Sequence, residues 1–195
     1  TVDSRNRDGR TPLMLAASKG RAEAIAALLA ARSSIEARDA KDLSPLDLAI
    51  LGCHSHAVLR LLQAGAKLAT HATTAVTSLM AASMSCDASV LQALLQHGAS
   101  VDARDRRNRT ALWHASDRGN LAGVSVLLAA GADAGAADAD GDLPLMRALE
   151  RGQIDVASAL LPATKSTGHA NKSGNTPLIL AARVGATAVV RGCFD

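Results

Sequence analysis

One short cluster carries residue types that could hold a metal ion. Cys53-His54-Ser55-His56 brings a thiol and two imidazoles together, and these are the ligand types that zinc prefers. On a helix, however, His54 and His56 would stand two residues apart and would not share a face. We therefore interpret the cluster as structural and predict no metal site in this chain.

A second run, of alternating carboxylates, has the spacing of a calcium loop. Asp138, Asp140 and Asp142 alternate, but Gly141 is misplaced for such a loop and the expected late Glu is absent. Short polar side chains also bond nearby backbone in tight turns, and we interpret the run as a turn. The sequence has no nucleophile elbow, phosphate loop or zinc-protease helix. We predict no catalytic residue and no cofactor.

The composition favours small, closely packed helices. Of 195 residues 48% are hydrophobic, yet Trp113 and Phe194 are the only aromatics, so the core must consist of small aliphatic residues such as Ala, the best helix former. The excess of 21 Lys and Arg over 18 Asp and Glu is mild and does not suggest binding to nucleic acid. No apolar stretch approaches the ~20 residues of a membrane span, and no signal-peptide pattern opens the chain.

The three cysteines bear on the compartment of the protein. Cys53, Cys86 and Cys193 form an odd set without CxxC spacing. This pattern is typical of free thiols in an intracellular, and so cytoplasmic, protein.

The elements that position these residues recur with a fixed period. A Thr-Pro-Leu pattern, complete or altered, begins at positions 11, 44, 77, 110, 143 and 176, so that every step is 33 residues. An alanine follows in the same phase in every unit, and a Gly or Cys follows nine residues after each Thr-type position. Such self-similarity is the signature of a repeat protein.

Residues 98–130 show what one unit should form. Asp105 lies in a tight turn, and Thr110 can cap the helix that follows it. Gly119 is predicted to end this first helix, and Gly131 to end a second helix of about residues 121–130. One such unit cannot bury its apolar face alone, so the units must stack.

The 33-residue unit resembles the ankyrin repeat, whose pattern is D-x-x-G-x-T-P-L-H-x-A-A-x-x-G followed by a Leu-Leu helix and G-A. The resemblance implies an all-α solenoid of stacked helix-turn-helix units with projecting β-hairpin turns. It covers the whole chain as a single domain, with units at about 6–38, 39–71, 72–104, 105–137, 138–170 and 171–195. Because residues 2–6 match the tail that precedes a hairpin, as 101–105 do, we expect a fragment of a longer ankyrin-repeat protein.

Several positions depart from the family pattern. The family's His is replaced in every unit, by Met14, Asp47, Met80, Trp113, Met146 and Ile179. We expect Asp47 to replace it as a polar partner and Trp113 to fill the gap between units, with His114 in a packing position. In the third unit Ala72 and Ala75 replace the turn Asp and Gly.

The resemblance also bears on the cysteines. Cys53 and Cys86 occupy equivalent positions one repeat apart. The family's spacing between repeats would place them beyond the ~7 Å limit between the Cα atoms of a disulfide.

The family resemblance also implies where a partner would bind. In ankyrin domains hairpin tips and first-helix ends on the concave face usually meet the ligand. Here these positions carry Arg104, Arg106, Arg107, Arg109 and Arg118 in unit four and Asp140, Asp142, Glu150 and Arg151 in unit five. The charges are either simply solvated or receive acidic groups of a partner, since Arg binds carboxylates with a planar fork.

The sequence therefore predicts a non-catalytic scaffold that binds another protein and not nucleic acid, and an acidic segment of that partner would suit the arginines. Two alternatives remain open. The repeats could recruit substrate for a catalytic domain elsewhere in a longer enzyme or effector, or they could serve as a structural spacer.

Overall fold

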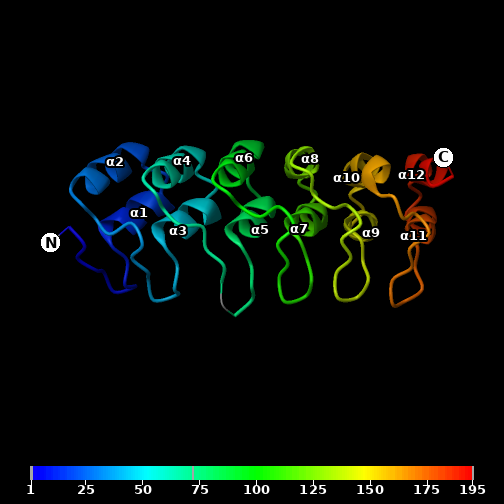
Figure 1. Ribbon diagram of the computed structural model, residues 1–195, viewed down its shortest axis with the longest axis horizontal. Helices are drawn as coiled ribbons and strands as arrows, with labels where there is room; N and C mark the ends of the chain where they lie inside the picture. Colours follow the sequence, from blue (N-terminus) through cyan, green and yellow to red (C-terminus); the bar gives the residue numbers. More distant parts are fainter. Residues whose placement is uncertain (1, 72, 195) are drawn as a thin grey trace.

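The computed structural model describes residues 2–71 and 73–194, which form a row of helix pairs (Figure 1). The first helices of the pairs are α1 (Pro12–Ser18), α3 (Pro45–Leu51), α5 (Ser78–Ser83), α7 (Ala111–Arg118), α9 (Pro144–Glu150) and α11 (Pro177–Arg183). The second helices are α2 (Ala22–Ala30), α4 (Ser55–Gln63), α6 (Ala88–Gln96), α8 (Leu121–Ala129), α10 (Ile154–Leu160) and α12 (Thr187–Gly192). Each helix contacts its own partner and the equivalent helix of the next pair. This arrangement confirms the all-α solenoid.

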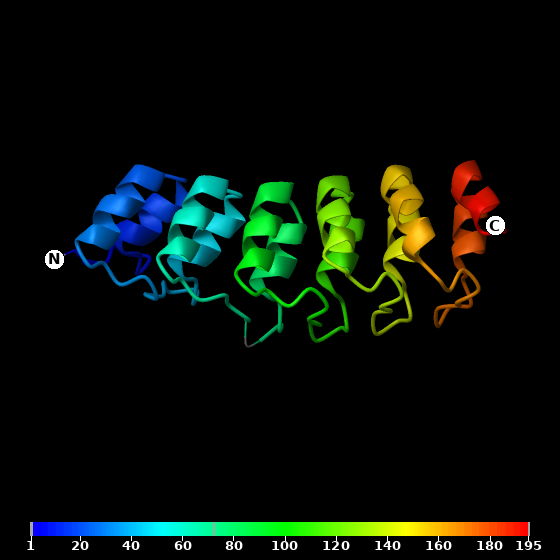
Figure 2. The same ribbon diagram turned by 45° about the horizontal axis from the view of Figure 1, so that its top comes forward.

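Loops project from one side of the helix rows (Figures 1 and 2). We call them fingers one to six, at residues 5–11, 38–44, 71–77, 104–110, 137–143 and 170–176. In finger four an Asp105 carboxylate oxygen accepts the backbone N–H groups of Arg107 and Arg109, at 2.8 and 3.0 Å. Asp138 does the same in finger five for Asp140 and Asp142. The turn interpretation of the acidic run is therefore confirmed.

The fingers are turns rather than long strands. Within the described residues the one isolated β-bridge joins Thr70 to Thr77. Finger three contains Ala75, which has a φ of 57° where fingers one, five and six have glycine. A Cβ is unfavourable in this left-handed region. The departure at Ala72 lies outside the described residues.

The first helices begin at the predicted caps. The Thr110 hydroxyl accepts the Trp113 backbone N–H at 3.3 Å, which confirms the predicted N-cap. The Asp47 carboxylate accepts the Ser44 N–H at 2.9 Å, so Asp47 is the polar partner that the sequence suggested. In unit one the Met14 sulfur lies 3.4 Å from the Thr11 nitrogen and takes the same place as a weak acceptor.

Many of the helix ends follow the glycine pattern, and the end of α10 departs from it in conformation as well as in sequence. Gly119 and Gly131 take the left-handed conformation, with φ of 71° and 84°, after α7 and α8. In unit five the short 3-10 helix η1 (Leu161–Ala163) follows α10 instead, and Thr164 leaves it in an extended conformation. Pro162 suits this ending, because its ring cannot continue an α-helix.

The core is continuous along the row because the same repeat positions are buried in each unit. In α7, Leu112, Ala115 and Ser116 have no exposed area. The Ser116 hydroxyl donates to the Leu112 carbonyl oxygen at 2.7 Å, so its burial leaves no polar group unpaired. Stacking of such faces is what stabilises a repeat array.

The expectation that the cysteines are free and too far apart to bond is wrong for one pair. Cys53 and Cys86 form a disulfide with their Cα atoms 5.0 Å apart. Packed helices keep their axes ~8–10 Å apart, but the loops that follow α3 and α5 approach more closely than the helices. Cys193 is the free cysteine.

Candidate protein-binding surface

Four charged side chains from α7 and unit five gather around Asp117, near the end of α7. We call this group the Asp117 cluster: Asp117, Arg118, Arg147, Glu150 and Arg151. One Asp117 carboxylate oxygen accepts from the Nε atoms of Arg147 at 2.6 Å and Arg151 at 2.8 Å. Arg118 Nε lies 3.7 Å from the other oxygen, and Arg147 Nη1 donates to Glu150 at 3.2 Å. Asp117 therefore organises the guanidinium groups of both units.

The cluster exposes its cations and covers its central anion. The Asp117 side chain is 13% exposed, whereas those of Arg118 and Arg151 are 61% and 51% exposed. Burial raises the pKa of Asp117, but the hydrogen bonds from Arg151 and Arg147 outweigh it and lower the pKa below its ordinary value. The Nη groups of Arg118 and Arg151 make no hydrogen bond to another described residue. They can therefore donate to an oxyanion.

Trp113 joins this cluster to the fingers. The guanidinium carbons of Arg109 and Arg147 lie 5.1 and 5.0 Å from the centre of the indole ring, within the range of cation–π attraction. Only 5% of Trp113 is exposed, as expected for a residue that fills the gap between units. Its Nε1 has no hydrogen-bond partner among the residues that the structure describes. A cavity of about 120 Å³ between fingers four and five is lined by Arg107, Asp140, Trp113 and Arg147, among others.

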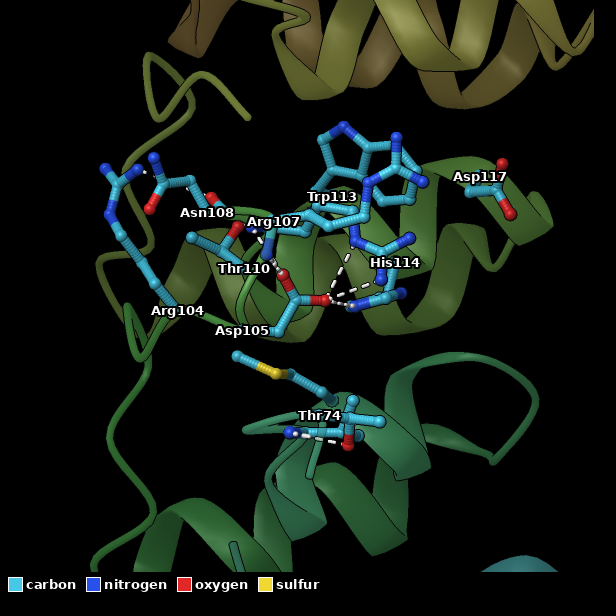
Figure 3. Close-up of polar contacts among 12 residues, drawn as sticks. Thr74, Arg104, Asp105, Arg107, Asn108, Thr110, Trp113, His114 and Asp117 are labelled. Carbon is cyan, nitrogen blue, oxygen red and sulfur yellow. Dashed lines mark hydrogen bonds and ion pairs between the residues drawn. The ribbon is translucent and has the colours of Figure 1, made fainter. Parts of the chain in front are cut away.

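A buried polar group supports this surface from below (Figure 3). One Asp105 oxygen contacts the Arg109 guanidinium at 2.8 Å and His114 Nε2 at 3.1 Å. Burial raises the Asp105 pKa, but the N–H groups of Arg109 and Arg107 lead the contacts that lower it overall. Burial also lowers the His114 pKa more than Asp105 raises it, so His114 is neutral and donates through Nε2. His114 thus ties α7 to finger four, beyond the packing role that the sequence suggested.

The sequence-predicted arginines of finger four have different roles. Arg104 donates to the carbonyl oxygens of Ala137 at 3.0 Å and Asn108 at 3.4 Å, as Arg5 does 99 residues earlier toward Arg38 and Gly9. Arg104 therefore fastens fingers together. Arg109 is held by Asp105.

The finger tips carry the other predicted charges. The exposed Arg106 donates its backbone N–H to the Thr74 carbonyl oxygen at 3.2 Å. Arg107 pairs with Asp140 at 3.3 Å across two fingers, and both are largely exposed. Asp142 accepts from Asn171 at 2.6 Å.

The structure brings Arg118 and Glu150 together in one cluster and Arg107 and Asp140 in one pair. Sequence reasoning missed Asp117 and Arg147, which join the two helices. The available signal was their phase, since Arg147 and Arg151 stand 33 residues after His114 and Arg118 and so lie at equivalent positions in the next unit.

Two residues of the Cys–His cluster, Cys53 and His54, make contacts that join neighbouring units. Cys53 is in the disulfide, and His54 Nε2 lies 3.2 Å from the Ser18 carbonyl oxygen of the preceding unit. Over the described residues, no group of three or more His, Cys, Asp or Glu is placed to hold a metal ion. No described helix is long and apolar enough to cross a membrane.

A helical solenoid of stacked pairs with fingers on one side defines a class of repeat protein, and comparisons identify the family. A family profile described as ankyrin repeats in many copies matches residues 2–49, and one described as three copies matches residues 69–138 and 127–192. The chain belongs to the ankyrin-repeat family. No curated protein sequence matches this chain in a direct comparison.

Solved structures agree. An ankyrin repeat domain from Acinetobacter baumannii AYE is 27% identical, with a TM-score of 0.81 over 94% of this chain and 96% of its own. The ankyrin repeat domain of Bcl-3, a member of the IkappaB family, is 26% identical, with a TM-score of 0.84 over all of this chain and 86% of its own. Ankyrin repeats are general protein–protein interaction modules.

Proposed function

We propose that this chain is a non-catalytic binding domain that holds an acidic segment of a partner protein on the fingers and first-helix ends of units four and five. The observation that carries the proposal is the Asp117 cluster. Arg118 and Arg151 contact Asp117 through Nε at 3.7 and 2.8 Å, and their side chains are 61% and 51% exposed. Paired guanidinium N–H groups match the geometry of a carboxylate.

The net charge of the Asp117 cluster and the restraint of its arginines also favour binding of an anion. Three arginines against Asp117 and Glu150 leave a local charge of 3 − 2 = +1. Because Asp117 already restrains the arginines, less side-chain entropy is lost when a carboxylate arrives. An exposed Arg without such an anchor would lose more.

The charged residues at the finger tips would fix the orientation of a bound partner segment. The exposed Arg107–Asp140 pair flanks the same cavity as Trp113 and Arg147. A partner carboxylate could pair with Arg107 in place of Asp140. A cationic group of the partner could then pair with Asp140. Charges of both signs in a fixed order select one orientation of an extended segment.

The same order of charges favours a protein over a nucleic acid. Asp140, Asp117 and Glu150 interrupt the arginines, and they would repel successive phosphates. A nucleic-acid site needs basic charge gathered on one face.

The test compares two pairs of arginine substitutions. Partners captured from source cells are identified, made recombinantly and titrated against wild type, Arg118→Gln/Arg151→Gln and Arg21→Gln/Arg60→Gln. The last two arginines are exposed on or beside second helices and form the matched control. We expect the first variant to bind about ten-fold more weakly, a loss of ~1.4 kcal/mol, and the control to bind normally.

The partner itself supplies the reciprocal experiment. Changing the acidic residues of its binding segment to Asn and Gln should remove the difference between wild type and the Arg118→Gln/Arg151→Gln variant. Equal affinity of all three variants for the partner would contradict the proposal. Competition by duplex DNA with a steep salt dependence would instead indicate a nucleic-acid surface.

A further inference from the structure

The disulfide joins two loops that occupy the same place in consecutive units. Cys53 follows α3 and Cys86 follows α5, 33 residues later, where the other four units have glycine. Cys53 takes the left-handed conformation that suits glycine, with a φ of 51°. Cys53 is partly exposed, whereas only 2% of Cys86 is exposed. The two sulfurs therefore differ in their access to solvent.

Each sulfur also has a polar neighbour that a free thiol could use. The Cys86 sulfur lies 3.2 Å from the Ile50 carbonyl oxygen, and the Cys53 sulfur lies 3.5 Å from the Ser85 hydroxyl. A buried thiol that can donate a weak hydrogen bond is not left unsatisfied. The same loops can therefore accommodate the reduced state.

The disulfide lies at the junction between units two and three. Backbone hydrogen bonds join neighbouring fingers from Ala40 to Asp8, Arg106 to Thr74, Ala139 to Arg107 and Lys172 to Asp140. For the described parts of fingers two and three, no such bond is present. The guanidinium of Arg38 donates to Asp42 within its own finger, whereas its equivalent Arg104 also reaches the next one. The covalent bond thus ties units two and three together.

We propose that Cys53 and Cys86 form a reversible thiol–disulfide site that fastens units two and three and exchanges with small thiols through Cys53. A small thiolate attacks the Cys53 sulfur, the S–S bond breaks, and the electron pair leaves on Cys86, which takes a proton. A second thiolate attacks the small molecule's sulfur in the mixed disulfide and releases Cys53. The cysteine pair is thereby reduced, and two small thiols are oxidised to their disulfide.

Thiol counting tests the proposal on the whole chain, with glutathione as the probe. After equilibration with glutathione disulfide, the denatured protein should show one titratable thiol, Cys193, and after excess glutathione it should show three. Burial raises the pKa of the Cys193 thiol, so that it competes poorly. Three free thiols under oxidising conditions, or a disulfide that resists excess glutathione, would overturn the proposal.

Single variants test which sulfur exchanges. In a Cys193→Ser background, Cys86→Ser should trap glutathione on Cys53, and Cys53→Ser should react about ten-fold more slowly at Cys86 because that sulfur is covered. Equal rates at the two positions would contradict the assigned direction of attack.

Thermal unfolding measures whether the bond fastens the junction. Reduction should lower the melting temperature of wild type by about 5–10 °C. Cys193→Ser should show the same fall, whereas Cys53→Ser/Cys86→Ser should melt like reduced wild type whether or not reductant is present. An unchanged melting temperature of wild type on reduction would show that the bond does not fasten the two units.

Discussion

The junction between units two and three and the junction between units four and five hold the same backbone architecture by different chemistry. The first relies on the Cys53–Cys86 bond, and the exposed side chains at its first-helix ends include Leu51, 62% exposed. The second has no cysteine and relies on Asp117 and its arginines, with Trp113 between them. The buried repeat positions keep the stacking of the units the same at both junctions. The exposed positions can therefore differ, both in the partners they bind and in the conditions that disrupt each junction.

The largest expected effect on stability comes from Trp113, at the junction between units four and five. Trp113→Ala would leave a cavity and remove the ring on which Arg109 and Arg147 lie. We expect the free energy of unfolding to fall by about 3 kcal/mol, measured by urea denaturation followed by far-UV circular dichroism. Trp113→Phe is the control, since the lost N–H has no partner, and it should cost less than ~1 kcal/mol. An equal loss for both variants would show that ring stacking does not hold this junction.

The next largest effect is expected from acid, which should destabilise the junction between units four and five through His114. The His114 pKa is lowered by burial, so the folded state binds fewer protons than the unfolded state as pH falls below about 6.5. Stability is therefore present above that pH and is lost on acidification toward the folded pKa. The urea midpoint should be lower at pH 5.5 than at pH 7.5 (chosen to bracket that value), and His114→Gln should reduce this difference.

A second loss of stability is expected at lower pH, again as the pH falls. The pKa values of Asp105 and Asp117 are lowered in the fold, so their contribution is present above the unfolded value near 4 and is lost as pH falls below it. Hydrogen exchange should show units four and five opening before unit three in acid, because no lowered carboxyl pKa is found among the described residues of unit three. Simultaneous opening of all units would contradict this local origin.

A smaller change should strengthen the middle of the row. Ala75→Gly removes a Cβ from a residue with a φ of 57° and should stabilise the chain by about 1 kcal/mol. Asn108→Gly, at the equivalent turn with a φ of 60°, should gain less because Asn tolerates this conformation. Thermal melts of the two variants would compare the fingers directly, and a larger gain for Asn108→Gly would contradict the explanation.

The smallest expected effect on stability belongs to the proposed binding residues. Arg118 and Arg151 are more than half exposed, and exposed ion pairs contribute little. Each single change to Gln should alter the free energy of unfolding by less than ~0.5 kcal/mol. A much larger loss would mean that these arginines serve the fold and not a partner.

The sequence predicted the helices because their determinants are local and phased. Thr110 caps α7, and Gly119 ends it, as the repeat pattern required. The predicted second helix of about residues 121–130 is observed as Leu121–Ala129.

Contacts between units were harder to predict. Whether Arg147 meets Asp117 depends on how far one helix is displaced along the next, which the period alone does not give. The Cys53–Cys86 bond was missed because an average spacing between helices was applied to loops that approach to 5.0 Å. The candidate arginines were found by their sign of charge, but Arg104 and Arg109 proved to be engaged within the fold.

The position of Trp113 has a spectroscopic consequence. The chain contains one tryptophan and no tyrosine, so its intrinsic fluorescence arises almost wholly from one indole enclosed by two guanidinium groups. Emission should therefore shift to the red when units four and five separate, even while most of the helices elsewhere persist. The protein carries its own optical reporter for one junction, placed beside the surface where a partner is expected.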